Sequence, residues 1–545
     1  MAAGNLPVIL PALPIGFGLV AVTALAAALA RRSMLPSSIF LVLVGVGIGF
    51  LPSMPRIELR PDLVLTLLLP PLLYSAGVGM SWRGFKANIR PILLMAVGLV
   101  IFTAASVAAV MHYLLDLSWA LGFVLGAIVA PPDAVAPMTI AKRFPIPRRV
   151  LVILEGEGLV NDATALILFS FAVAAVIAGG AFSPAAAIGS FVAIVAGELA
   201  WGLLMGWAAL SLRRWAQEPR VEIILAMLTP YAAFWVPESL GGSGVLAAVT
   251  AGLFVSWNGP RFIAPATRLQ GYFVWNLATY LIEGVIFLLT GLQAPVIADS
   301  LGQADWLRLG LAAVSVTAAI ILVRFIWVFA STYLPCWLWP AWRRRNPAPP
   351  WQETFAIAFT GIRGVVSLAA ALSIPLMAGP APFPERGLLL LVTFVVILAT
   401  LVGQGFSFAW VIQKLGLTIL GKREADQAKQ REVQARVAGI DAALSRLDRL
   451  KSAGLAPEMV EILRRRHTDR RAYFVSACRD LESGQAIANS MALQLEFLEA
   501  EREAIAGLYA DGTLEDEARR RIERELDLDE SRIRHAAESG TSRVG

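Results

Sequence analysis

The feature that most constrains this chain is a series of long apolar runs separated by charged residues, glycines and prolines. A helix that crosses the hydrocarbon core of a bilayer needs about 20 predominantly apolar residues. The sequence therefore predicts thirteen membrane spans, of which the second, eighth and ninth are short; alternatively, one of these is a half-span or re-entrant segment. The predicted spans are 8–30, 38–53, 62–80, 91–114, 119–141, 150–178, 185–212, 221–236, 243–258, 271–296, 307–336, 352–378 and 387–413.

Charge divides the chain into two parts. Residues 1–420 contain 24 Lys/Arg and 16 Asp/Glu, whereas the last 125 residues contain 22 and 24. The whole chain is only 16% charged, against about 25% in soluble globular proteins, and this deficit excludes an ordinary soluble enzyme or nucleic-acid binder despite the net charge of +6. We expect an all-α polytopic membrane domain at 1–420 and a water-exposed domain at 421–545.

The second part has the periodicity of helices. Apolar residues recur three or four positions apart between Val433 and Leu450, and the stretches 458–483, 485–509 and 514–535 have the same character. These patterns predict a small cytosolic helical bundle or short coiled coil. A regulatory or dimer-stabilising role is compatible with it.

The loops between the spans differ in basic charge. Alternate loops, which include Arg343 to Arg345, contain 18 Lys or Arg residues, and the intervening loops contain only four: Arg56, Arg60, Arg308 and Arg386. Cytoplasmic loops are enriched in Lys and Arg. The expected orientation in the cell (inner) membrane therefore has the N-terminus outside and the C-terminus in the cytoplasm.

Eight charged residues lie at membrane depth, away from the ends of the predicted spans. On insertion scales each costs roughly 2.5–3.5 kcal/mol at a helix centre. Acids outnumber arginines, so some carboxylates must be protonated, hydrated or neutralised by a bound cation, which indicates a pathway for cations or protons. The residues are Asp133, Glu155, Glu157, Asp162, Glu198, Glu283, Arg324 and Arg363.

Asp133 lies in the segment Ala-Pro-Pro-Asp-Ala-Val-Ala-Pro, where three prolines in eight residues prevent a regular helix. The span is expected to unwind there, and carbonyl groups freed at broken helices coordinate ions in transporters. The alternative is a proline kink in which the aspartate bonds loose amides.

The next span contains a second polar cluster, with Glu155, Asn161 and Asp162 within two turns of helix. Glu157 lies four residues before Asn161 and shares its helix face. Such an oxygen-rich set suits a hard cation. For the arginines we expect Glu157 to pair with Arg363, which glycines flank, and Glu283 to pair with Arg324. The pattern suggests no partner for Glu198.

At these residues the sequence resembles the monovalent cation/proton antiporters of the sodium/proton exchanger type, especially bacterial members with a cytosolic extension. The motifs are Pro-Pro-Asp-Ala-Val-Ala, Glu-Gly-x-x-Asn-Asp-Ala and Gly-x-Arg-Gly-x-x-Ser-Leu-Ala at 361–369. The resemblance implies a homodimer whose core domain contains crossed, unwound helices related by an inverted repeat, together with a dimerisation domain. It also implies a role in pH homeostasis and no cofactor.

The resemblance further implies roles for individual residues. Asp162 resembles the carboxylate that carries Na⁺ and H⁺ alternately, with Asp133 as the acid of the unwound helix and Asn161 as its amide neighbour. Glu157 and Arg363 resemble a core ion pair. Pro132 and Gly158 stand where many relatives have hydroxyl residues, so backbone carbonyl or water is the expected replacement near the ion.

We therefore expect an antiporter, not an enzyme, that exchanges Na⁺ or Li⁺ for H⁺ at Asp162 and Asp133. Because Asn161 is neutral where an electrogenic relative would have an acid, the expected exchange is 1:1 and electroneutral. The nearest alternative is a K⁺/H⁺ antiporter. A cation channel and an intramembrane aspartyl hydrolase are alternatives of other classes; the first lacks a repeated filter sequence, and the second lacks a Gly-x-Gly-Asp environment.

Overall fold

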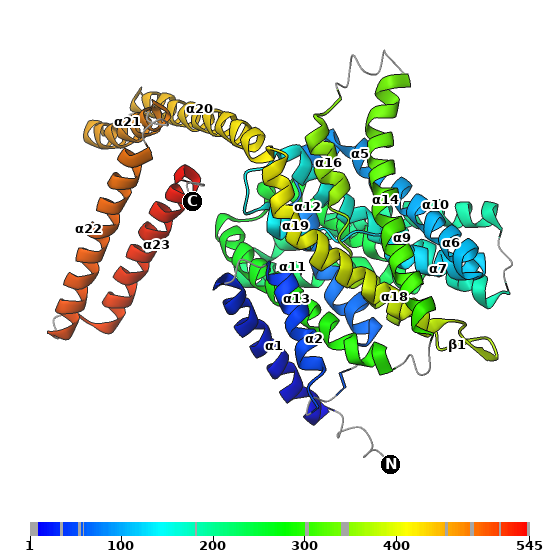
Figure 1. Cartoon of the computed structure of the whole chain (residues 1–545). Helices are drawn as coiled ribbons and strands as arrows, with labels where there is room; N and C mark the ends of the chain where they lie inside the picture. The colour runs from blue at the N-terminus through cyan, green and yellow to red at the C-terminus, as the bar shows by residue number, and fades with distance from the viewer. Residues whose placement is uncertain are drawn as a thin grey trace. The chain divides into compact units, whose positions relative to one another are not determined.

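The computed structural model describes residues 9–32, 36–52, 56–57, 59–179, 183–299, 305–338, 348–452, 456–479, 484–511 and 514–541. The chain divides into two compact units, Met1–Gly421 and Lys422–Gly545 (Figure 1). The arginine-rich loop segment 343–345 lies outside the described residues.

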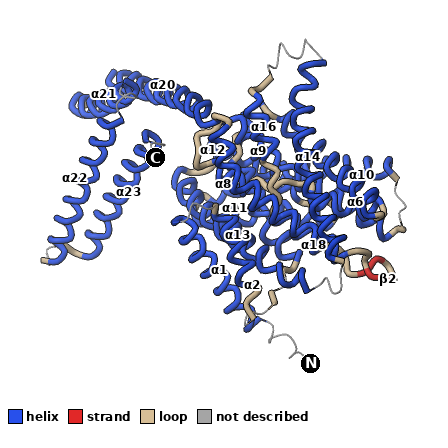
Figure 2. Tube along the Cα trace, viewed as in Figure 1, coloured by secondary structure: helices blue, strands red, loops and turns tan. Residues whose placement is uncertain are grey.

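The first unit is all-α, as predicted. Among the described residues, seven of its helices are long and apolar enough to cross a membrane, and shorter apolar helices accompany them. Backbone groups have no water to bond in hydrocarbon, so each span must satisfy them internally, which a helix does. In the part of the chain that the structure describes, the strands are limited to the short antiparallel pair β1 (Met377–Ala378) and β2 (Ala381–Pro382) (Figure 2).

The helices follow the predicted apolar runs closely. The first seven runs contain α1 (Ile9–Arg32), α2 (Ser37–Gly49), η1 and α3 (Leu63–Leu68, Leu69–Gly79), α5, η2 and α6 (Ile89–Leu93, Leu94–Leu99, Val100–Leu115), α7 and α8 (Trp119–Val129, Val135–Ala141), α9 (Arg148–Ile177) and α10 (Pro184–Ala216). The remaining runs contain α11 (Pro219–Ser239), α12 (Val245–Phe262), α13 (Pro265–Asp299), α14 (Trp306–Leu338), α16 and α17 (Trp351–Phe359, Val365–Leu372), and α18, η3 and α19 (Arg386–Leu398, Ala399–Gln404, Gly405–Lys414). The short helix α4 (Trp82–Ala87) lies between α3 and α5.

Two crossings bring helix backbones into direct contact. Gly45 of α2 faces Gly291 of α13, and a Cβ atom on either would collide with a carbonyl of the other helix. Gly77 of α3 faces Gly252 of α12 in the same way. Small residues allow this close approach, and in a membrane it provides packing that the hydrophobic effect does not supply.

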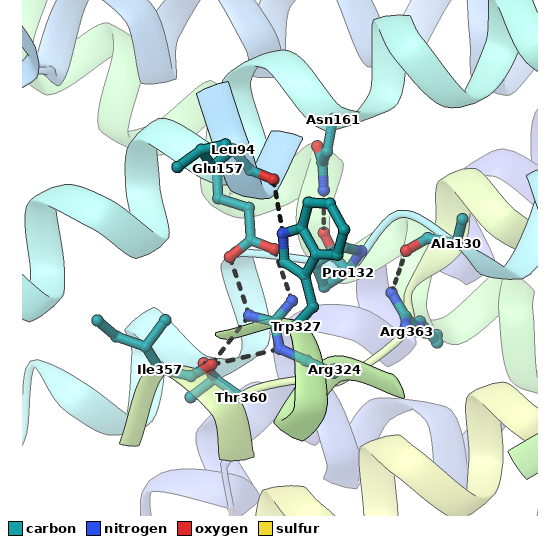
Figure 3. Close-up of polar contacts among 10 residues, drawn as sticks. All are labelled: Leu94, Ala130, Pro132, Glu157, Asn161, Arg324, Trp327, Ile357, Thr360 and Arg363. Atoms are coloured by element: carbon teal, nitrogen blue, oxygen red, sulfur yellow. Dashed lines mark hydrogen bonds and ion pairs between the residues drawn. The ribbon is translucent and has the colours of Figure 1, made fainter. Parts of the chain in front are cut away.

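The segments η1, η2 and η3 are π-helical, and each inserts an extra residue into a span. A π-helical turn disturbs the regular pattern of backbone hydrogen bonds. At the start of η2, the carbonyl of Leu94 accepts a hydrogen bond of 2.9 Å from Nε1 of Trp327 on α14 (Figure 3). The indole ring lies over Gly98, where a side chain would clash with it.

The second unit contains α21 (Pro457–Arg479), α22 (Gly484–Ala510), α23 (Asp516–Thr541) and most of α20 (Leu417–Ser452). Ion pairs join neighbouring helices: Arg471 Nε lies 2.7 Å from Asp441, and Arg502 Nη2 lies 2.6 Å from Asp527 and 2.7 Å from Glu530. The periodicity thus predicted helices that the structure contains. Their function stays a prediction.

Candidate functional site

The site is built where two interrupted helices meet. Residues 130–134 separate α7 from α8, and residues 360–364 separate α16 from α17. The backbone N–H of Asp133 donates to the carbonyl of Ile362 at 2.8 Å. Arg363 Nη1 donates to the carbonyl of Ala130, as Figure 3 shows. Each break therefore provides hydrogen-bond partners for some of the unpaired backbone groups of the other. Irregular backbone at membrane depth requires such partners within the protein.

Gly364 and Gly158 make room at this crossing. A Cβ atom on Gly364 would lie 2.6 Å from Cβ and 2.8 Å from Oδ2 of Asp133. A Cβ atom on Gly158 would lie 2.5 Å from Cβ of Ala134. Gly158 thus has a steric reason to lack a side chain, in addition to its expected place near the ion.

The helix α9 brings the second polar cluster to the break. Asn161 is fully buried and its Nδ2 donates to the carbonyl of Pro132 at 2.7 Å (Figure 3). The Pro132 carbonyl is one of the groups that a regular helix would have bonded. This hydrogen bond holds Asn161 beside the segment that contains Asp133 and places Asp162, the next residue, near the same crossing.

Three side chains here have at least one oxygen that accepts no hydrogen bond from the described residues. Asp133 Oδ1 accepts from the N–H of Val135 at 3.0 Å, but its Oδ2 and Oδ1 of Asn161 are buried without a partner in the described part of the chain. Asp162 is 9% exposed and forms no hydrogen bond or ion pair with the residues that the structure describes. Buried polar atoms are nearly always satisfied, so these oxygens are free to bind something else.

The arginine partners expected from the sequence are wrong. Glu157 pairs with Arg324 of α14 and not with Arg363: Nη1 and Nη2 of Arg324 lie 2.6 and 2.9 Å from the two carboxylate oxygens (Figure 3). Arg324 Nη2 also donates to the carbonyl of Ile357 at 3.0 Å, so the expected Glu283–Arg324 pair is not formed either. The cause is tertiary: α14 passes α9 at Glu157, whereas Arg363 extends to the broken helix.

Two further polar residues stabilise elements near the site: Thr400, which was not predicted, and Glu198, for which the sequence suggested no partner. The hydroxyl of Thr400, in η3, accepts the backbone N–H of Arg363 at 3.0 Å and anchors the second break. Glu198 of α10 accepts from the backbone N–H groups of Ser243, Gly244 and Leu246 at 2.6–3.0 Å, so it caps the start of α12, where the helix dipole favours negative charge. For Thr400, the only signal in the sequence is a threonine within an apolar run.

A cavity of about 210 Å³ lies on one side of Asp162. Leu166 and Ser170, one and two helical turns beyond Asp162 on α9, line it together with Glu238 of α11 and Ser373. The topology predicted from the loops places this cavity on the outer side of the membrane.

Known proteins resemble this chain along most of its length. Residues 19–414 match the family model for the transmembrane domain of sodium/hydrogen exchangers. An uncharacterized Na⁺/H⁺ exchanger of Mycobacterium bovis is 33% identical over 539 residues, which are 96% of this chain and 97% of the relative. The Na⁺/H⁺ antiporter ApNhaP of Aphanothece halophytica is 30% identical over 76% of this chain and 75% of its own length.

Two further matches extend the comparison. A sodium, potassium, lithium and rubidium/H⁺ antiporter of Bacillus pumilus is 33% identical over 66% of this chain and 56% of its own length. The solved sodium proton antiporter MjNhaP1 from Methanocaldococcus jannaschii, 19% identical, superimposes with a TM-score of 0.60 over 75% of this chain and 99% of that structure, and therefore shares the fold. The extent of these matches places the chain in the sodium/hydrogen exchanger family, whose members are membrane transporters.

Proposed function

We propose that this chain exchanges Na⁺ for H⁺ across the membrane at Asp162, with Asp133 as the neighbouring acid. One observation supports this most strongly: both arginines at membrane depth are engaged elsewhere, Arg324 by Glu157 and Arg363 by the carbonyl of Ala130. A buried carboxylate without a cationic side chain is costly to ionise. A proton or a dehydrated cation is therefore the natural neutralising partner of Asp162.

Exchange follows if proton and cation compete. In its ionised form Asp162 binds Na⁺ with help from the free oxygens of Asp133 and Asn161 and from backbone carbonyls near Pro132. In its protonated form it cannot bind Na⁺. If the core changes its accessible side only when one of the two is bound, each crossing of Na⁺ is coupled to the return of one H⁺.

The stoichiometry depends on Asn161. Its side chain is neutral at every pH and its Nδ2 is already bonded to the carbonyl of Pro132, so we propose that Asp162 alone changes its charge state at each crossing. This predicts a 1:1 electroneutral exchange. The competing cation is Na⁺ in this proposal, and Li⁺ and K⁺ are included in the test because the Bacillus pumilus relative is named for several alkali cations.

The proposal includes the cellular setting. We place the chain in the cell (inner) membrane with its N-terminus outside and its C-terminus in the cytoplasm, supported by the distribution of basic loops. A homodimer, an inverted repeat in the core, a role in pH homeostasis and a regulatory role for residues 421–545 are supported by the family resemblance alone. Cysteine cross-links between copies in the membrane would test the dimer.

The decisive experiment is ion-resolved exchange. The full chain is reconstituted in vesicles that contain a pH-sensitive dye and are acidic inside, and Na⁺, Li⁺, K⁺ or Rb⁺ is added outside. Wild-type protein is expected to release internal protons on addition of Na⁺, and Asp162→Asn is expected to abolish this response. Asp116→Asn is the matched control, because Asp116 is an exposed residue at the end of α6 whose left-handed conformation asparagine tolerates. Exchange that persists in Asp162→Asn would refute the carrier assignment.

A further inference from the structure

A second polar cavity lies away from Asp162, among α1, α2, α8 and α13. Its volume is about 20 Å³, and Glu283 of α13 is the charged residue on its wall. Hydroxyl-bearing residues line the cavity together with Glu283; they include Thr23, Ser37, Ser38 and Thr139. A cavity of this size holds about one water molecule or one ion without its hydration shell.

Two of these hydroxyls lack a protein partner. Thr23 is 1% exposed and Ser38 is 3% exposed, and their oxygens have no hydrogen bond in the part of the chain that the structure describes. Such buried, unsatisfied groups are rare and each needs an explanation. In contrast, Thr290, two turns further along α13, is equally buried and donates to the carbonyl of Ile286 at 2.8 Å.

The carboxylate of Glu283 also lacks an ion-pair partner among the described residues, although the charge of Lys142 attracts it from a longer distance. Arg324, which we expected to pair with Glu283, instead forms its ion pair with Glu157. A water molecule in the cavity would satisfy hydroxyls but would leave the carboxylate charge in place. A cation satisfies both, because hydroxyl and carboxylate oxygens are ligands for hard cations.

The cavity also borders α8, which follows the broken segment that contains Asp133. Val135 and Thr139 on its wall belong to α8, the half-helix that begins two residues after Asp133. The basic residues Lys142 and Arg143 follow α8, so by the predicted topology this cavity lies toward the cytoplasm. It is thus on the opposite side of the crossing from the 210 Å³ cavity that Leu166 and Ser170 of α9 line.

We propose that Glu283, with the hydroxyls of Thr23 and Ser38, forms a second binding site for a monovalent cation, at which Na⁺ pauses between Asp162 and the cytoplasm. This inference rests on the proposed function for the identity of the cation. It assigns to Glu283 a role in cation passage, separate from the exchange of Na⁺ against H⁺ at Asp162.

The test counts bound Na⁺. Binding of ²²Na⁺ to the purified full chain in lipid nanodiscs is measured at alkaline pH for the wild type, Asp162→Asn, Glu283→Gln and the double variant. Two sites are expected in the wild type, one in each single variant and none in the double variant. In the Asp162→Asn background, Thr23→Val and Ser38→Ala are each expected to weaken the remaining site about tenfold, which is about 1.4 kcal/mol, whereas Thr290→Val leaves it unchanged.

Two results would overturn the second site: no ²²Na⁺ binding in Asp162→Asn, or equal binding by the wild type and Glu283→Gln. If Glu283→Gln fails to fold, Thr23→Val and Ser38→Ala still test the proposal. An unchanged ²²Na⁺ affinity after both hydroxyls are removed would also contradict the second site. Failure of the proposed function is seen separately, as Na⁺-driven proton release by Asp162→Asn. The exchange at Asp162 stands unaffected if only the second site fails.

Discussion

At the scale of residues, the ion pair between Glu157 and Arg324 is the most consequential contact in the core. Both side chains are 1–2% exposed, and the pair is bidentate. Removing one partner of such a pair leaves an unpaired charge in a medium of low dielectric constant, which costs roughly 3–5 kcal/mol. Replacing both partners by neutral groups costs much less, since no charge is left behind.

A double-mutant cycle can check this pairing. We expect Arg324→Met and Glu157→Gln each to lower the thermal unfolding midpoint of the detergent-purified protein strongly, and the double variant to be more stable than either. A parallel cycle of Glu157→Gln with Arg363→Met serves as the control and should show much weaker coupling, because Arg363 donates to the carbonyl of Ala130. Equal coupling in the two cycles would contradict the assignment of Arg324.

The sequence identified the buried charges but not all of their contacts. Asp133, Asn161 and Asp162 were selected because acids and amides are rare in apolar runs, and the structure brings Asn161 to the carbonyl of Pro132. The arginine partner of Glu157 is determined by how α14 and residues 360–364 pack near α9. A single sequence contains no information on that packing. Their roles in ion binding remain proposals.

At the scale of elements, the two broken helices depend on close approach. Gly364 begins the second half of its helix with its Cα against the side chain of Asp133. An alanine there would place a methyl group 2.6–2.8 Å from three atoms of that side chain, less than any ordinary contact. The aspartate or the break would have to move.

We therefore expect Gly364→Ala to displace the Asp133 side chain and to reduce the rate of Na⁺-driven proton exchange at least tenfold. A tenfold loss corresponds to about 1.4 kcal/mol of free energy. Gly403→Ala is the matched control: Gly403 lies in η3, and a Cβ atom there would meet no atom within 4 Å. It should exchange at the wild-type rate, and its stability should be equal or slightly higher, since alanine favours helix over glycine. Initial rates in the dye-loaded vesicles measure the two variants side by side, and wild-type exchange by Gly364→Ala would show that the contact is dispensable.

The first break was predicted from the residues, the second was implied only by the family resemblance, and the π-helices were not predicted. Prolines at 131, 132 and 137 prevent hydrogen bonding in the first interrupted helix, and glycines at 361 and 364 flank the second. A π-helical turn adds one residue to an apolar run that is already long enough to span the bilayer, so η1, η2 and η3 leave no trace in hydropathy. The glycine pairs at the helix crossings are likewise visible as residues, but their partners depend on the packed fold.

At the scale of the whole molecule, competition between Na⁺ and H⁺ fixes the direction of the pH dependence. Protonation of the Asp162 site removes the form that binds Na⁺, because a cation ligand must be deprotonated. As the pH falls through the range in which the site becomes protonated, the apparent Na⁺ affinity should fall and approach about a tenfold loss per pH unit. Measuring the half-saturating Na⁺ concentration at several pH values tests this, and a value independent of pH would exclude competition at one site.

The same competition determines how the transporter responds to voltage. Exchange of one Na⁺ for one H⁺ moves no net charge, whereas exchange with one uncompensated charge would gain or lose about 2.3 kcal/mol per 100 mV, or about fiftyfold in the Na⁺ gradient at equilibrium. We expect vesicles clamped by valinomycin and K⁺ gradients at 0 and −100 mV to reach the same Na⁺ distribution for a given pH difference. A shift of that distribution with voltage would show that a second charge moves with each cycle. Asp133, the other carboxylate at the crossing, would then be the first residue to test, because Asn161 has no proton to exchange.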